Sequence, residues 1–199
     1  MPADTVFSAP VPSALAAPQA PISWAAIWAG AAVAVAFALV LTLAAAGLGY
    51  ATGLPGLATR SSLAGFNPTV GAAAIVIQVL SGALGGYLAG RLRTTWIGVH
   101  GDESHFRDTA HGLFAWAVAT IAGVVLAAIV LAPYADQLAA ASAAAAADLT
   151  PAQANRAARI AAQSSLFIAI GMLLSAFVSA AAARIGGLQH EAMWAKREG

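Results

Sequence analysis

Four stretches of the chain are almost continuously apolar. They cover about residues 24–50, 69–90, 112–131 and 165–183, and none of them contains Asp, Glu, Lys, Arg or His. A helix needs about 20 apolar residues to cross the roughly 30 Å hydrocarbon core of a bilayer. Continuous apolar runs favour helices over barrel strands, which alternate apolar and polar positions. The pattern predicts an all-α integral membrane protein with four transmembrane helices in two hairpins.

The composition agrees with this prediction and excludes several classes of protein. Of the 199 residues, 60% are hydrophobic and 9% are charged, whereas soluble domains carry about 25% charged residues. The lipid bilayer is therefore the expected surrounding of the chain. A formal net charge of +1 without a basic run argues against a nucleic-acid partner. The absence of cysteine excludes disulfides and thiolate metal sites.

The segments outside the spans predict the domain layout and the orientation. Residues 1–23 contain five prolines, which predicts a flexible Ala/Pro-rich tail. Residues 24–187 form the predicted transmembrane domain, and residues 188–199 a short tail. Six basic residues fall on the side of the termini, namely Arg91, Arg93, Arg107, Arg184, Lys196 and Arg197. Only Arg60, Arg156 and Arg159 fall on the other side. The positive-inside rule therefore predicts cytoplasmic N- and C-termini.

The two outer connections differ in character. Residues 51–68 are short and rich in turn residues, which predicts a tight connection between the first two spans. Residues 132–164 are rich in Ala, which favours a helix. Within them, the sequence DLTP at 148–151 predicts a helix start with Thr150 as N-cap and Pro151 in the first position. We expect this helix to continue through Arg156 and Arg159 into the fourth span.

The two predicted hairpins share a weak sequence similarity. WAGAAVAVAFALVL starts at Trp28 and WAVATIAGVVLAAI at Trp116, and the later span of each pair ends in LAGR or AAAR. One interpretation is a parallel internal repeat, related by an axis along the membrane normal. The other is that Ala-rich spans resemble each other by composition alone.

Each span carries small residues at four-residue spacing, a pattern that lets helix backbones approach closely in a bilayer. The two clearest ridges consist of Gly82, Gly86 and Gly90 in the second span and Gly171, Ser175 and Ser179 in the fourth. The first and third spans carry similar ridges, Ala26, Gly30, Ala34 and Ala38, and Ala115, Ala119, Gly123 and Ala127. We expect these ridges to form helix packing or subunit contacts, that of the second span above all. Gln78 is the most polar residue within a span, and Thr42 or Thr120 is its expected partner.

Most of the candidate chemistry lies in the sequence VHGDESHFRDTAHG at 99–112. It holds the candidate docking or metal-binding residues His100, Asp102, His105, Asp108 and His111. His and carboxylate side chains are common ligands of divalent metals, although no established ligand spacing is present. The alternative is structural: Asp108 or Thr109 caps the third span, and Arg91, Arg93 and Arg107 balance the acidic residues. A haem held by two of the histidines is a further alternative.

Several blocks of this sequence resemble a family of small bacterial multi-span inner-membrane proteins, termed YrzE-like or PhnA-like. The blocks are ISWAAIWAG at 22–30, AAGLGYATG at 45–53, VLSGALGGYLAGRLR at 79–93 and FRDTAHGLFAWAVAT at 106–120. The matching positions are Gly85, Gly86, Gly90, Arg91, Asp108, His111 and Gly112. The resemblance implies a bacterial inner-membrane protein without an established activity. The PhnA label implies no zinc-ribbon chemistry here, because the chain has no cysteine.

These observations favour a non-enzymatic structural or accessory protein that packs with itself or with a larger membrane complex. The sequence contains no Ser–His–acid arrangement, phosphate-binding loop or paired catalytic carboxylates, and it predicts no bound cofactor. One alternative is a passive channel or small-solute transporter formed between the hairpins or between subunits. The other is a metal- or haem-binding membrane protein that uses the His/acid loop.

Overall fold

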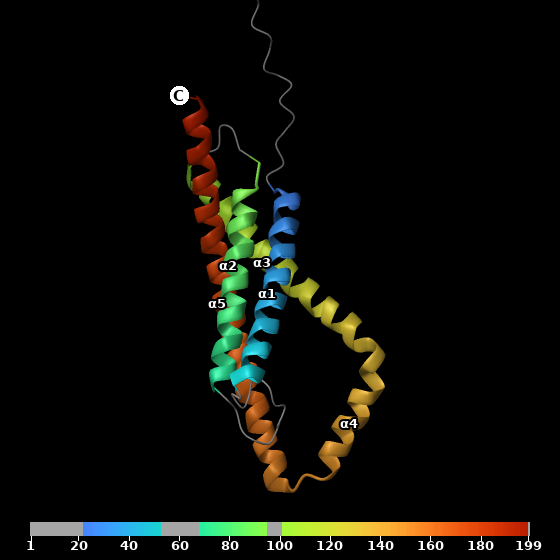
Figure 1. Cartoon of the computed structure of the whole chain (residues 1–199). Coiled ribbons are helices and arrows are strands. Elements are labelled where there is room, and N and C mark those ends of the chain that lie inside the picture. Colours follow the sequence, from blue (N-terminus) through green and yellow to red (C-terminus); the bar gives the residue numbers. More distant parts are fainter. Residues whose placement is uncertain (1–21, 53–67, 95–100, 199) are drawn as a thin grey trace, which may run out of the picture.

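The computed structural model describes residues 22–52, 68–94 and 101–198, and this part of the chain is helical (Figure 1). The helices are α1 (Trp24–Thr52), α2 (Pro68–Arg91), α3 (Gly101–Leu131), α4 (Ala135–Ala147) and α5 (Pro151–Glu198), with a 3₁₀ turn η1 (Ala132–Tyr134) between α3 and α4. Four of them, α1, α2, α3 and α5, are long and apolar enough to cross a membrane. The prediction of an all-helical protein with four helices that could span a membrane is therefore confirmed.

The long helices alternate in direction, so that α1 begins, α2 ends, α3 begins and α5 ends at the same end of the molecule (Figure 1). The most extensive contact joins α2 to α5, which belong to different predicted hairpins, and α1 packs mainly on α2. The two hairpins are thus not separate packing units in this arrangement, and the internal repeat stays a prediction. Residues 1–21 of the predicted tail, residues 53–67 of the predicted connection at 51–68, and His100 lie outside the described residues.

The small-residue ridges of α2 and α5 pack directly against each other. Gly82 lies opposite Ser175, Gly86 opposite Ser179, and Gly90 opposite Ala183, and in each pair a Cβ on the glycine would collide with the facing residue. The other side of α2 is equally close to α1, where Gly85 meets Gly30 and Ala34. The ridge of α2 is therefore used inside the chain, which leaves it no surface for a partner subunit.

Two hydroxyl groups of α5 bond it to α2 and to α3. The Ser175 hydroxyl donates to the carbonyl oxygen of Gln78 at 2.8 Å, and the Ser179 hydroxyl donates to that of Gly112 at 2.8 Å. The expected partners of the Gln78 side chain were wrong. Thr42 and Thr120 donate to the carbonyl oxygens four residues earlier in their own helices, and the Gln78 Oε1 atom accepts no hydrogen bond. A hydroxyl satisfied within its own helix turn no longer needs a partner across the bundle.

The helix start predicted at DLTP is confirmed, and so is its continuation into the fourth span. α5 runs without interruption from Pro151 to Glu198. The Thr150 amide donates to Gln153 Oε1 at 2.8 Å, while the Gln153 amide donates to Thr150 Oγ1 at 3.4 Å. This reciprocal pair is a capping box, which satisfies amide groups that a helix start leaves open. Residues 188–198, predicted as a tail, continue the same helix.

The predicted cap of the third span was wrong. α3 begins at Gly101, so Asp108 and Thr109 lie inside the helix, and the Thr109 hydroxyl donates to the His105 carbonyl oxygen at 2.8 Å. The acidic residues Asp102 and Glu103 occupy the first turn instead, where the helix dipole favours negative charge. The polar sequence before the third span is thus a helical extension of that span.

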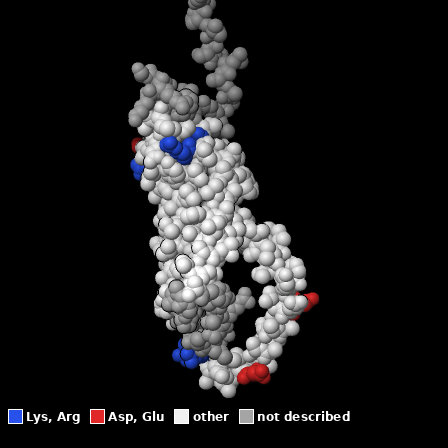
Figure 2. Space-filling model, in the orientation of Figure 1, with Lys and Arg blue, Asp and Glu red and all other residues white. Residues whose placement is uncertain are grey.

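Residues 124–156 leave the bundle and form a separate arm (Figure 1). The arm comprises the end of α3, η1, α4 and the first turn of α5, and all its residues except Leu149 are exposed. Figure 2 shows an opening between the arm and the bundle, and charged side chains at the two ends of the bundle and on the arm. Within the described chain, α4 packs substantially on η1 alone.

The close contact of α2 with α5 makes a specific prediction about Gly86. Gly86→Ala places a Cβ against the Ser179 carbonyl oxygen, and such overpacking costs about 1–3 kcal/mol of unfolding free energy. We expect this loss in unfolding titrations of the detergent-solubilised protein, followed by circular dichroism. Gly47→Ala is the matched control, because a Cβ there meets nothing within 4 Å. Equal stability of the two variants would contradict the packing described.

Candidate functional site

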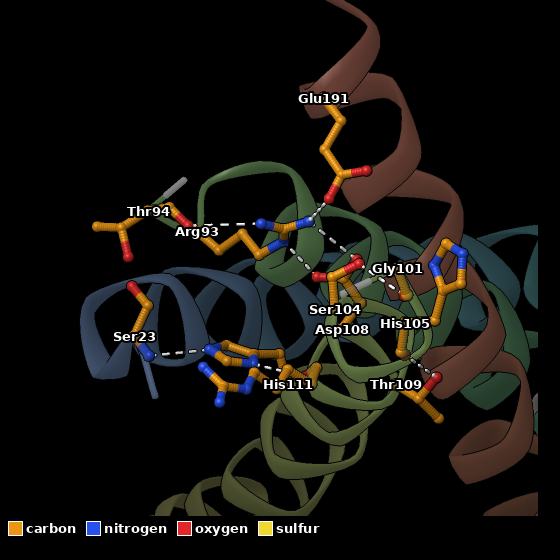
Figure 3. Close-up of polar contacts among 11 residues, drawn as sticks. Ser23, Arg93, Thr94, Gly101, Ser104, His105, Asp108, Thr109, His111 and Glu191 are labelled. Carbon is orange, nitrogen blue, oxygen red and sulfur yellow. Dashed lines mark hydrogen bonds and ion pairs between the residues drawn. The ribbon is translucent and has the colours of Figure 1, made fainter. Parts of the chain in front are cut away.

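A group of polar side chains is buried where the start of α3, the end of α2 and the last turns of α5 meet (Figure 3). Arg93 follows α2 and is 2% exposed, and Asp108 on α3 is 1% exposed. Their side chains form a two-point ion pair, in which Nε contacts Oδ1 and Nη2 lies 3.1 Å from Oδ2. The same Nη2 lies 2.7 Å from Oε1 of Glu191 on α5. One guanidinium therefore joins three segments.

Small residues on α5 make this approach of the carboxylate possible. A Cβ on Gly187 would collide with both carboxylate oxygens of Asp108, so glycine at this position leaves room for the carboxylate. Beside it, the Tyr87 hydroxyl donates to Gln189 Oε1 at 2.6 Å, and Arg91 donates to the same oxygen at 3.4 Å. The ridge packing of α2 on α5 thus continues into polar contacts at the end of the bundle.

His111 connects the same region to the start of α1. Its Nδ1 lies 2.7 Å from the Arg107 carbonyl oxygen, and its Nε2 accepts a hydrogen bond from the Ser23 amide at 2.8 Å. Because Nε2 acts as the acceptor, the ring is neutral and carries its proton on Nδ1. The rings of Trp24 and Phe114 lie next to this contact, with centroids 6.2 Å apart. The ring of His111 therefore holds α1 against α3.

We call Ser23, Arg93, Asp108, His111 and Glu191 the polar end cluster. Its charged groups and hydrogen-bonding atoms face each other, which suits a structural connection. Among the residues that the structure describes, no group of three His, Cys, Asp or Glu side chains is placed to hold a metal ion. The arrangement thus gives no support to a metal site there.

The sequence-predicted site residues separate into two groups in the structure. Asp108 and His111 are buried in the polar end cluster. Asp102 and His105 lie outside it: Asp102 is exposed, and His105 is half-buried with no hydrogen-bond partner at its Nδ1 atom. The expectation that arginines neutralise the acidic residues is met by the ion pair of Arg93 with Asp108. The Arg107 side chain contacts Glu103 one turn away, at 2.7 Å. The ridge residues form the α2–α5 contact instead of a ligand site.

Sequence reasoning missed Ser23 and Glu191. Both lie far along the chain from Asp108, in segments predicted as tails, and no local spacing connects them to it. Their positions became evident only when the structure brought the start of α1 and the last turns of α5 to the same end of the bundle as Asp108.

The chain matches no model of a known protein family, no curated protein sequence and no solved structure. The geometry defines the class, a multi-pass helical bundle that carries a buried polar cluster at one end and an uncovered helical arm. Any function assigned to the chain therefore comes from that geometry and from the sequence.

The polar end cluster predicts that substitution of Arg93 lowers the unfolding free energy much more than substitution of Arg107. Arg93→Met leaves the Asp108 carboxylate buried without its cation, and breaking a buried pair in this way costs about 3–5 kcal/mol. Arg107→Met removes a partly exposed pair within one helix turn, which contributes less than about 1 kcal/mol.

Unfolding of both variants in detergent, followed by tryptophan fluorescence, measures this difference. Asp108→Asn combined with Arg93→Met removes both charges, so we expect it to recover part of the loss. Equal effects of the two arginine substitutions would contradict the assigned role of Arg93.

Proposed function

We propose that this protein is a non-enzymatic structural or accessory protein of the bacterial inner membrane, with cytoplasmic termini, and that it contacts its partner through the arm. The observation that supports this proposal best is the exposure of residues 124–156 beside a bundle in which the α2 and α5 ridges are already packed. The partner is a second copy of the chain or another membrane protein.

Because the bundle is closely packed, we no longer expect a partner to bind at the glycine ridge of the second span. That ridge is covered by α5, so an additional helix has no access to it. The arm has the opposite character. Beyond the third span, the apolar side chains of Tyr134 and Leu138 are 47–54% exposed, and α4 is composed largely of Ala.

The composition of the arm suits contact with other helices. The 33 residues of the arm include only three charged side chains, those of Asp136, Asp148 and Arg156. Small side chains allow close backbone approach between helices, and few charges have to be desolvated when another helix binds. The third apolar span ends at Leu131 and α4 begins at Ala135, so α4 presents this surface outside the hydrocarbon core.

The polar end cluster supports the structural part of the proposal. Arg93 is bonded to both Asp108 and Glu191, and both ring nitrogens of His111 are engaged. These groups fix the helices of the bundle relative to one another. They hold the bundle as a support from which the arm projects.

Cysteine cross-linking tests the role of the arm directly, because the chain contains no cysteine of its own. Ala140→Cys places a thiol on α4, which is exposed along its length. We expect a bismaleimide to link this thiol, in native membranes, to a second copy or to one other protein. Mass spectrometry of the product distinguishes these two partners.

Gln163→Cys is the matched control, because Gln163 is exposed on α5 beyond the arm and, like α4, lies outside the apolar spans. If the proposal is correct, this variant gives little product at the same reagent concentration. Cross-linking of Ala140→Cys no stronger than that of Gln163→Cys, together with a monomeric mass in nanodiscs, would overturn the proposal.

A further inference from the structure

The contact between Ser23 and His111 depends on the protonation state of one ring nitrogen. The Ser23 amide can only donate a hydrogen bond, so the Nε2 atom, 2.8 Å away, must supply a lone pair. The other nitrogen, Nδ1, is engaged with the Arg107 carbonyl oxygen at 2.7 Å. A protonated imidazole carries N–H groups on both nitrogens and accepts no hydrogen bond. Uptake of one proton by His111 therefore breaks its contact with Ser23.

The burial of this ring couples its protonation to movement of the start of α1. His111 is 1% exposed, and its ring lies on α3 directly against Ser23 (Figure 3). A buried charge without hydration is unfavourable, so the charged ring needs water, which reaches it when Ser23 moves away. The body of α1 packs mainly on α2. The movement therefore concerns the first turn of α1 and its contact with α3.

The surroundings of His111, which precedes the third apolar span, oppose its protonation. Burial lowers the pKa of His111 from its ordinary value of 6.5, and the cations Arg93 and Arg107 lower it further, whereas the bond to the Arg107 carbonyl oxygen raises it. The first turn of α1 brings no charged side chain, and Glu191 and His190 of α5 face Arg93. A neutral ring is therefore favoured in the folded chain. The contact is intact above about pH 6.5 and is lost as the pH falls through the lowered pKa.

Asp108 titrates nearby with the opposite effect. Burial raises the pKa of Asp108 from 3.8 to about 6, which outweighs the opposing influence of the Arg93 cation. The folded chain therefore binds this proton more tightly than an unfolded chain does. Titration of Asp108 thus stabilises the folded chain as the pH falls from about 6 toward 3.8. A loss of structure at the start of α1 in acid has the sign expected for His111, and not for Asp108.

We propose that the Ser23–His111 contact is a pH-sensitive switch, which holds the start of α1 on α3 at neutral pH and releases it in acid. The rest of α1 stays in the bundle, because Gly30 packs closely on Gly85 of α2. Since α3 continues into the arm, the switch connects acidity on the side of the termini with the arm. This last consequence rests on the proposed function, whereas the switch itself does not.

Hydrogen exchange at the Ser23 amide of the full-length protein in nanodiscs tests this inference. Mass spectrometry with electron-transfer fragmentation measures the exchange rate between pH 7.5 and 5.5, and division by the intrinsic rate at each pH gives a protection factor. We expect this factor to fall about five- to tenfold over the range, because opening is coupled to uptake of one proton by a ring of ordinary pKa. The Leu92 amide, bonded to the Leu88 carbonyl oxygen at 2.9 Å, reports general loosening at this end and keeps its protection.

Two substitutions of histidine separate the switch from other titrations. His111→Gln keeps an acceptor for the Ser23 amide and cannot take up a proton, so its protection at Ser23 does not change with pH, whatever its level. His105→Gln is the matched control, because His105 lies on the same helix outside the polar end cluster, and its protection at Ser23 falls as in the unmodified protein.

Three outcomes would each overturn the inference. They are constant protection at Ser23 in the unmodified protein, an equal fall in His111→Gln, and an equal fall at the Leu92 amide. The exchange measurement does not involve the arm, so its failure is distinguished from failure of the cross-linking.

Discussion

The close approach of α2 to α5 is the contact on which the rest of the structure depends. Inside a bilayer, lipid tails are as apolar as leucine, so helices gain little from covering apolar side chains and depend on packing and hydrogen bonds. Gly82, Gly86 and Gly90 bring the two backbones together, and the Ser175 hydroxyl adds a hydrogen bond to α2. The Ser179 hydroxyl bonds α5 to Gly112 on α3 instead. A larger side chain at any of these glycines would separate the helices and the residues beyond them.

The polar end cluster depends on this contact, because Glu191 reaches Arg93 only when α5 is in place. Burying an ion pair costs a desolvation penalty that its attraction barely repays. Such a pair therefore contributes more to fixing one arrangement of helices than to stability. Here it joins the end of α2, the start of α3 and the last turns of α5. The far part of α3 lacks comparable contacts, which is why it can turn away from the bundle.

The sequence predicted the parts of this fold that depend on local chemistry. The four spans follow from apolar length, and the start of α5 follows from Thr150 and Pro151. The small-residue ridges indicated which face of α2 and α5 packs. The partner of each ridge could not be predicted, because all four spans carry similar ridges. The same reason explains the error on Gln78. The start of α3 was misplaced because Asp108 resembles a cap residue in sequence, whereas its carboxylate is used by an arginine from another segment.

The length of α5 links the two ends of the molecule mechanically. Its 48 residues extend about 72 Å at 1.5 Å per residue, more than twice the thickness of the hydrocarbon core. The helix contains no proline after Pro151 and no break, so it behaves as one stiff rod. Its first turn belongs to the arm and its last turns carry Glu191. A tilt imposed on the arm outside one face of the membrane would therefore displace the carboxylate at the opposite face.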